Sequence, residues 1–337
     1  MYLLIDLNFV MFRSLHASEG AAMTSRAVWA GRDIHTGSGR LSAISILSAI
    51  KQVESWNKCL FKPERLWLCD DVGRSFRKEL DDEYKATRTQ DFAEDYDDMF
   101  FCKKIITALF LGYGASWLGQ KSYEADDVIW ALSRYLSSKE QTHYILSTDL
   151  DLFQALEGPF ARIMRPKYVG QGYDVFSQDN ILNGHKSRGE PWMCRDRWDV
   201  LLFKVLVGDK SDNWKGMKGF GVQAWFEMRS LMDELSITAR DVLENPEANL
   251  SVLSMHGFSK SKKIVPERFT HGVNLLKLVV PKKITNFESI PIAKSTSNNK
   301  MNANIVKKGD RIAAEAAACD YGMFGVVESM KAMFPCV

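Results

Sequence analysis

The sequence lacks the features of several common classes of protein. No apolar run approaches the ~20 residues that a membrane-spanning helix needs. The start, MYLLIDLNFVMF, has no basic region before it and is interrupted by Asp6, which favours a core strand over a signal peptide. The six cysteines form no C-x-x-C pair and lie in largely apolar surroundings, which indicates reduced thiols. We therefore expect a soluble, cytoplasmic protein.

The chain also lacks a large net charge. A value of +2 over 337 residues is too small to indicate nucleic-acid binding from composition alone. The charge is unevenly distributed, because acids crowd residues 79–98 whereas lysine and arginine dominate residues 260–283. With 46% apolar residues the chain can bury a large core. This suits one sizeable α/β domain with a smaller attached module.

What the chain does contain is a set of acids at the ends of apolar runs. LLID ends at Asp6, LWLCD at Asp70 and LLFKVLVGD at Asp209. In an open α/β sheet the carboxyl ends of the strands share one edge, where ligands collect. Carboxylates that meet there repel one another unless a cation lies between them, and hard divalent ions suit oxygen ligands. Any single acid is equally explained as a helix cap. The whole set predicts a metal centre made by Asp6, Asp70, Glu124, Asp126, Asp127, Asp149, Asp151, Asp209 and Asp212.

Two short segments carry most of these acids. YEADDVIWAL places acidic residues before an apolar series with helical spacing, and the helix dipole explains part of that pattern. HYILSTDLDLFQAL reads as a short strand followed by Asp149 and Asp151. Alternate residues of an extended chain share a face, so this D-x-D pair can turn both carboxylates toward one ion.

The alternation of strands and helices predicts a mostly parallel sheet covered on both faces. We expect strands at residues 3–5, 66–69, 115–118, 144–146 and 161–164. We expect helices at residues 42–59, 98–111, 125–137, 195–207 and 311–333, with a connection at 170–194.

Five ordered motifs carry a family resemblance. They are CDDVGRSFR, YKATR, YEADD, STDLDLFQ and GDKSDNWKGMKGFG, and they fall between residues 69 and 221. In this order they resemble the flap endonuclease family, in particular its bacterial and phage branch with the 5′-nuclease domain of DNA polymerase I. Cys69 stands where the family usually has phenylalanine, and Trp214-Lys215 replaces the usual Ile-Pro.

The resemblance implies a PIN-like α/β fold with a helical arch and a helix-three-turn-helix, or helix-hairpin-helix, module. It implies a catalytic domain at residues 1–193 with the arch at 78–105, a DNA-binding region at 194–290 and a C-terminal linker and helix at 291–337. Two Mg²⁺ ions, or Mn²⁺ in their place, would be bound by the acids. The first would be held, directly or through water, by Asp6, Asp70, Glu124 and Asp126. The second would be held by Asp149, Asp151, Asp209 and Asp212, with Asp127 between them.

The resemblance also implies roles for basic residues. Lys85 and Arg88 of the arch would approach the scissile phosphate, although ordinary surface salt bridges are the alternative. Arg77 would contact a phosphate, or else be the structural partner of Asp70 and Asp71. Tyr84, in the same motif as Lys85 and Arg88, would contact DNA. The glycine-rich segment would hold DNA phosphates, with a K⁺ ion bridging loop carbonyls. Its residues are Lys215, Gly216, Lys218, Gly219 and Gly221.

The function implied is that of a structure-specific 5′ nuclease, a 5′→3′ exonuclease and flap endonuclease of DNA replication, of the phage type. Its substrates would be DNA 5′ ends, flaps and nicks, and RNA–DNA hybrids. A single-strand binding protein or a polymerase is the expected protein partner. Two alternatives are a PIN-type ribonuclease, which needs no glycine-rich module, and a non-catalytic DNA-binding relative, which would have lost acids.

Overall fold

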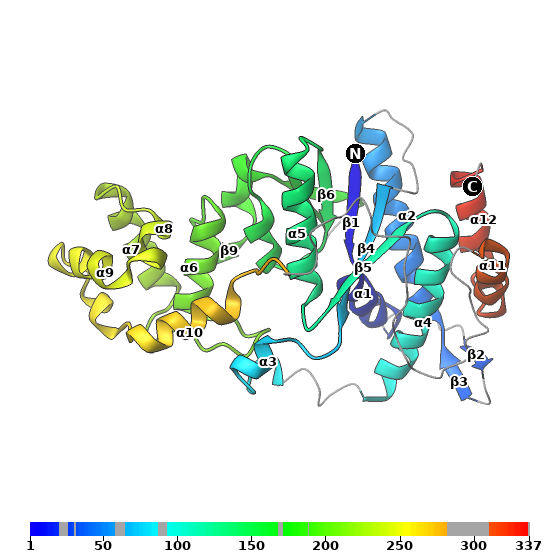
Figure 1. The fold of residues 1–337 in the computed structure, drawn as a ribbon, viewed down its shortest axis with the longest axis horizontal. Coiled ribbons are helices and arrows are strands. Elements are labelled where there is room, and N and C mark those ends of the chain that lie inside the picture. The colour runs from blue at the N-terminus through cyan, green and yellow to red at the C-terminus, as the bar shows by residue number, and fades with distance from the viewer. Residues whose placement is uncertain are drawn as a thin grey trace.

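The structure is a computed structural model that describes residues 1–19, 26–29, 32–57, 65–86, 93–167, 171–187, 189–281 and 310–335. Its centre is a six-stranded sheet with the order β5-β4-β1-β6-β7-β8. Neighbouring strands are parallel except for β8, which runs antiparallel to β7 (Figure 1). The strands are β1 (Tyr2–Asp6), β4 (Leu66–Val72), β5 (Ser116–Lys121), β6 (His143–Leu146), β7 (Ala161–Pro166) and β8 (Tyr173–Phe176).

The sheet is buried on both faces, and strand β1 shows why its sequence is a continuous apolar run. Leu3, Leu4 and Ile5 have no exposed surface. Leu4 belongs to one hydrophobic core, whereas Leu3 and Ile5 belong to a second core on the other face. A parallel strand that lies between two helix layers needs apolar residues at successive positions. The predicted α/β class with helices on both faces is therefore confirmed.

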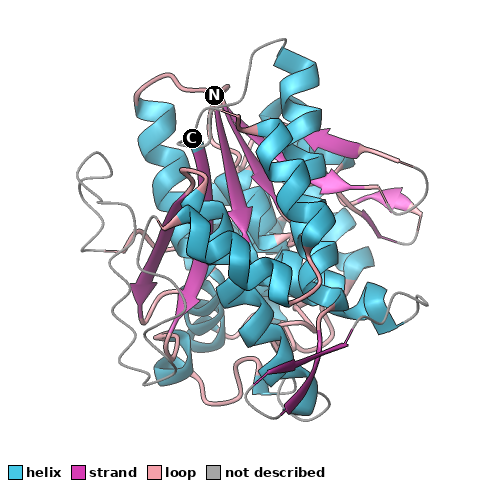
Figure 2. Ribbon diagram, turned by 90° about the vertical axis from the view of Figure 1, so that its right-hand side faces the viewer, coloured by secondary structure: helices cyan, strands magenta, loops and turns pink. Residues whose placement is uncertain are grey.

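One helix layer is built from the N-terminal half of the chain and the C-terminal helices. In Figure 2 this layer lies in front of the strands. It consists of α1 (Leu7–Glu19), α2 (Gly37–Asn57), α4 (Ala93–Gly112), α11 (Arg311–Asp320) and α12 (Phe324–Met333). The Tyr113 hydroxyl, just after α4, donates to Glu315 of α11 at 2.6 Å and fixes α11 against the body.

The opposite layer begins with α5 (Ala125–Ser138) and α6 (Arg197–Val207), and the chain then continues away from the sheet (Figure 1). Residues of α5, α6 and the following helices share a single hydrophobic core. The helices after α6 are α7 (Val222–Glu234), α8 (Ala239–Glu244), α9 (Pro246–Met255) and α10 (Pro266–Leu276).

Short elements complete the chain. They are the helix α3 (Arg77–Leu80), the 3₁₀ helices η3 (Asp151–Ala155), η4 (Gln178–Asn183) and η5 (Ser259–Lys263), and the strand pairs β2 (Arg26–Trp29) with β3 (Arg32–His35) and β9 (Lys186–Ser187) with β10 (Glu190–Pro191). In the part of the chain that is described, no helix is both long and apolar enough to cross a membrane.

Two predicted elements were wrong. The connection expected at residues 170–194 contains β8, η4 and the β9–β10 pair. The single helix expected at residues 311–333 is interrupted, because Gly322 adopts a left-handed φ of 71° that ends α11. There Gly322 N–H donates to Cys319 O at 2.9 Å and Met323 N–H to Ala318 O at 3.0 Å, which is the bonding of a glycine helix stop.

Candidate active site

The acids meet because three neighbouring strands end at the same edge of the sheet. Asp6 is the last residue of β1, which pairs in parallel with β4 on one side and β6 on the other. Ser147 follows β6, and its hydroxyl donates to Asp6 Oδ2 at 3.1 Å. Asp6 also accepts the backbone N–H of Phe9 at 3.0 Å and so begins α1. The strand-end position predicted for Asp6 thus places it beside the segment that carries Asp149.

Two groups of three carboxylates have ligand oxygens within 4.8 Å of one another. They share Asp151, which begins η3, so the two positions are adjacent. Every donor is a carboxylate oxygen, and this suits Mg²⁺ or Mn²⁺. We call them group one (Asp126, Asp149 and Asp151) and group two (Asp151, Asp209 and Asp212).

The charges of these acids are poorly compensated in group one. Removal from water, with added repulsion from Asp149 and Asp6, raises the pKa of Asp126 well above its ordinary value. Burial, with the carboxylates of Asp71 and Asp149, raises the pKa of Asp6 to about 7. A divalent ion bound here would relieve both costs, so the electrostatics fit the metal site that the sequence predicts.

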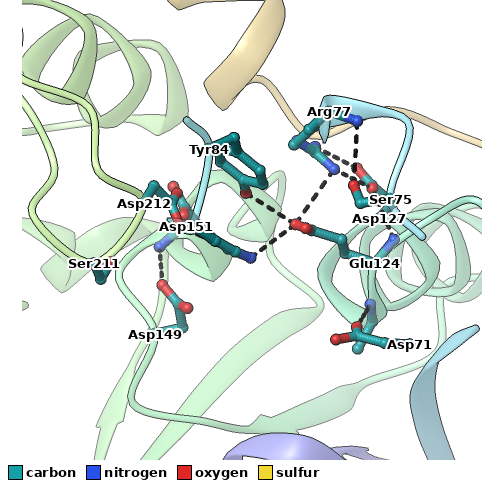
Figure 3. A network of polar contacts seen from close by, with 12 residues as sticks. Asp71, Ser75, Arg77, Tyr84, Glu124, Asp127, Asp149, Asp151, Ser211 and Asp212 are labelled. Atoms are coloured by element: carbon teal, nitrogen blue, oxygen red, sulfur yellow. Dashed lines mark hydrogen bonds and ion pairs between the residues drawn. The ribbon is translucent and has the colours of Figure 1, made fainter. Parts of the chain in front are cut away.

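Glu124 occupies the start of α5 and collects three donors (Figure 3). Its Oε2 accepts from the Tyr84 hydroxyl at 3.0 Å and the Lys85 ammonium at 3.0 Å, and lies 3.5 Å from Arg77 Nη1. Burial alone would raise the Glu124 pKa, but Lys85 and Arg77 lower it to about 2. Tyr84 is 3% exposed and its hydroxyl is engaged by Glu124, so the DNA contact expected of it stays a prediction.

Asp127 and Arg77 form a buried ion pair. Both Asp127 oxygens accept from Arg77, at 2.6 and 2.8 Å, and Val279 N–H donates to Oδ1 at 2.8 Å. Arg77 also donates to the carbonyls of Leu275 and Lys277 at 2.8 and 2.9 Å. Arg77 is 2% exposed, and its pairing with an acid agrees with the structural alternative to a phosphate contact, although the acid is Asp127. Asp127 is fully buried and engaged by a cation other than a metal ion, and its place between the two ions stays a prediction.

Asp70 likewise has a cation beside it. Its Oδ1 contacts the ammonium of Lys103, which comes from α4 and also donates to Asn8 at 2.7 Å. Trp117 Nε1 donates to Asp70 Oδ2 at 3.3 Å. Asp70 belongs to neither three-acid group among the described residues, and its place at the first ion, directly or through water, stays a prediction. The next residue, Asp71, instead accepts from Ala125 N–H at 2.6 Å at the start of α5.

The Lys85 ammonium lies close to two of the acids, Glu124 and Asp212. The ammonium is 3.0 Å from Glu124 and 3.7 Å from Asp212 Oδ1, and the Lys85 side chain is 17% exposed. The backbone of Lys85 has a φ of 53°, a conformation that costs a non-glycine residue about 1–3 kcal/mol. Contacts with the loop before α7 hold it there, since Lys85 N–H donates to Asp212 O at 3.1 Å and Asn213 Nδ2 to Glu83 O at 2.9 Å.

A buried lysine that the sequence analysis did not single out lies within group two. Lys204 of α6 is 3% exposed, and its ammonium contacts Asp151 Oδ1 and lies 2.5 Å from Asp209 Oδ2. Burial lowers the pKa of a lysine, but Asp151 and Asp209 raise that of Lys204 above its usual value. Lys204 in turn brings the pKa of Asp209 down to about 2, although burial opposes this. The available signal was a single lysine inside the apolar run LLFKVLV.

The glycine-rich loop joins α6 to α7. A bridge between Asp209 and Trp214 closes it, with backbone hydrogen bonds of 2.7 and 2.8 Å. Gly216 is buried at a φ of 65°, and a Cβ there would lie 2.6 Å from Leu206 O, so its role is packing rather than the predicted DNA contact. The remaining predicted residues are exposed, namely Lys215, Lys218, Gly219 and Gly221.

Part of the predicted arch, residues 87–92, lies outside the described residues, and so does Arg88. The arch assigned to residues 78–105 therefore stays a prediction. Asp98 of α4 lies within the predicted arch and is among the described residues. It accepts a hydrogen bond from the backbone N–H of His35, the last residue of β3, at 2.9 Å, and this bond joins α4 to β3.

Comparison with known families identifies the family of the chain. A family model described as "5′-3′ exonuclease, N-terminal resolvase-like domain" matches residues 1–183, more than half of the chain. The chain belongs to this 5′-3′ exonuclease family. The match confirms the family resemblance, and it covers the first four of the five motifs and the strand edge at which Asp6 and Asp149 lie.

Individual relatives agree with the family. The 5′-3′ exonuclease of Bacillus subtilis is 27% identical over 203 residues, which are 58% of this chain and 64% of that protein. The chain spans less than two thirds of the length of the curated relatives that it matches first.

Solved structures with the same fold include two from bacteriophage T5. One is a 5′-exonuclease with divalent zinc bound, with a TM-score of 0.58, 15% identity, and coverage of 99% of this chain and 98% of that one. The other is a flap endonuclease in complex with DNA and metal ions, with a TM-score of 0.57, 15% identity and the same coverage. At this identity the likeness establishes the fold.

Proposed function

We propose that the protein is a structure-specific 5′ nuclease, a 5′→3′ exonuclease and flap endonuclease that hydrolyses phosphodiesters near the 5′ ends of DNA and of RNA in RNA–DNA hybrids. The single observation that carries this proposal is the pair of adjacent three-acid groups that share Asp151, in a chain of the 5′-3′ exonuclease family. Free 5′ ends, flaps and nicks are its proposed substrates, in DNA replication, with a single-strand binding protein or a polymerase as partner.

The donor sets fit two Mg²⁺ ions, with Mn²⁺ as a substitute. Asp126, Asp149 and Asp151 would hold one ion, and Asp151, Asp209 and Asp212 the other, with Asp6 close by. Two such ions activate a water molecule and stabilise the leaving oxygen when bound. The raised pKa values of Asp6 and Asp126 support this assignment, because a cation would favour their ionised forms.

The residues of this chain supply positioning and charge. Glu124 anchors the Lys85 ammonium at the edge of the acids, where it can meet a phosphate whose negative charge grows in the transition state. Asp127 and Arg77 hold the start of α5 in place, which fixes Asp126 one residue away. Lys215 and Lys218 project from the loop before α7 and are proposed to hold the duplex backbone without reading sequence, with K⁺ at the same loop.

A digestion series tests the proposal. Oligonucleotide flap, nicked-duplex and RNA–DNA hybrid substrates, labelled at either end, are incubated with the protein and Mg²⁺. We expect cuts near the 5′ end or the flap junction and none at 3′ ends. The same series with a bulky adduct on the 5′ end distinguishes threading from internal cutting. Equal cleavage of blocked and free flaps, together with cuts within unpaired RNA, would favour a PIN-type ribonuclease.

A further inference from the structure

Lys204 occupies part of one ion position. Its side chain leaves α6 within the hydrophobic core, and its ammonium approaches two of the three carboxylates of group two, those of Asp151 and Asp209. Both carboxylate oxygens lie within ion-pairing distance of the ammonium. Because the side chain is 3% exposed, solvent offers it no alternative position without a rearrangement of α6.

The two groups therefore differ in the positive charge already present. In group two Lys204 pairs with Asp151 and Asp209, and Lys85 lies 3.7 Å from Asp212. Group one has the ion pair of Asp151 with Lys204 in common with group two. Its other two acids, Asp126 and Asp149, form no salt bridge of 4.0 Å or less with a lysine or arginine among the described residues. A bound cation thus gains more Coulomb energy in group one.

We propose that the Lys204 ammonium is a resident cation of group two, which competes with a divalent ion for Asp151 and Asp209 and makes ion binding there weaker than in group one. This inference rests on the two-ion function proposed above. It follows that the two positions bind their ions in a fixed order. The Asp126–Asp149–Asp151 position fills first, and the position beside Lys204 fills at a higher ion concentration.

Manganese binding tests the order directly, without DNA and without turnover. The full chain is freed of metal with EDTA, dialysed and titrated with Mn²⁺, and free Mn²⁺ is followed by electron paramagnetic resonance. The wild-type protein should bind two ions in two separate steps. Lys204→Met keeps the side-chain length and removes the charge, so it should tighten the weaker step by at least ~10-fold. The tighter step should change less, because only Asp151 of group one pairs with Lys204.

Arg229→Met is the matched control. Arg229 of α7 is a buried cation that pairs with Asp199 at 3.1 Å, and it lies outside both groups. Its loss should lower stability but leave both Mn²⁺ steps in place. A weaker step that is equally tight or looser in Lys204→Met overturns the inference and leaves the two-ion site standing. A wild-type protein that binds no Mn²⁺ overturns both.

Lys204→Met leaves carboxylates without their cation and can unfold in EDTA. In that case the titration is followed by circular dichroism. Recovery of the native spectrum with millimolar Mg²⁺, but not with NaCl of equal ionic strength, supports the inference. A variant that stays unfolded with Mg²⁺ contradicts it, because the ion should then replace the missing ammonium.

Discussion

Lys85 and Asp212 are joined twice, although they lie far apart in the sequence. The backbone N–H of Lys85 donates to Asp212 O at 3.1 Å, and its ammonium lies 3.7 Å from Asp212 Oδ1. One residue of this pair follows α3 and the other precedes α7, so the contact links the segment that leads into the predicted arch with the glycine-rich loop. If the loop binds a duplex as proposed, a shift of the loop on binding would move the Lys85 ammonium through these contacts.

The first prediction concerns this ammonium. Lys85→Ala should lower single-turnover cleavage of a 5′ flap by at least ~100-fold, because a preorganised charge at the reacting phosphate is lost. The dissociation constant for the same DNA should change little. Lys331→Ala, at an exposed lysine of α12, is the control and should cleave like the wild type. A loss confined to DNA affinity would mean that Lys85 captures substrate instead.

The second prediction concerns the Arg77–Asp127 pair. Arg77→Met should destabilise the protein by about 3–5 kcal/mol, since it leaves a fully buried carboxylate without its cation. Arg74→Met is the matched control, because the Arg74–Asp82 pair is exposed and should contribute at most about 1 kcal/mol. Urea unfolding measures both. Similar stabilities for the two variants would show that the buried pair is not a structural anchor.

The third prediction concerns pH. The folded pKa of Asp6, about 7, is above the ordinary value of 3.8 for an aspartate, so the folded state is more stable where Asp6 is protonated. This contribution is complete below about pH 4 and is lost as the pH rises toward 7. In EDTA the melting temperature should therefore fall between pH 5 and pH 7.5. Burial raises the pKa of Asp199 to about 6, which adds to this fall, and lowers the pKa of His143 to about 4, which opposes it below about pH 6.5. Glu124 and Asp209 have pKa values lowered to about 2 and do not change in this window.

Divalent ions should remove that pH dependence, because a bound cation favours the ionised acids in place of protons. Melting curves in Mg²⁺ serve as the comparison. Calorimetry at pH 6 should also detect protons released when Mg²⁺ binds. A melting temperature that rises from pH 5 to pH 7.5 in EDTA would contradict the assignment of Asp6 to an uncompensated acidic cluster.

The fourth prediction concerns the exposed lysines of the glycine-rich loop. Lys215→Glu combined with Lys218→Glu should weaken duplex binding equally for all sequences, and the salt dependence of the dissociation constant should become shallower. Titrations of labelled duplex at several KCl concentrations measure the slope. Lys260→Glu with Lys262→Glu, in the basic 3₁₀ helix η5, is the comparison. A slope that changes only in the η5 variant would place the duplex there.

The sequence predicted the sheet well because its signals are local. Apolar runs such as residues 3–5 and 144–146 form strands, and the parallel topology then brings their ends together. The acids that directly follow those runs were recognisable for the same reason. Gly322 broke a predicted helix because a left-handed residue leaves little trace in an otherwise apolar helical pattern.

The partners of charged side chains were not predictable in the same way. Asp70 and Asp127 look like ligands in their motifs, yet they pair with Lys103 and Arg77 from other elements. Lys204 is the converse case, since only the packing of α6 places its ammonium among the acids. Such contacts depend on which helix faces which strand end, and residue spacing within one segment does not encode that.

The central claim is that Asp126, Asp149 and Asp151 form part of a metal-dependent 5′ nuclease site. The most direct test is single-turnover cleavage of a 5′-labelled flap by the wild type and by Asp149→Asn, with Mg²⁺ and with excess EDTA, alongside DNA binding measured in EDTA. We predict cleavage by the wild type with Mg²⁺ alone, none by Asp149→Asn, and nearly equal DNA affinities. Full cleavage in excess EDTA, or by Asp149→Asn, would contradict the claim.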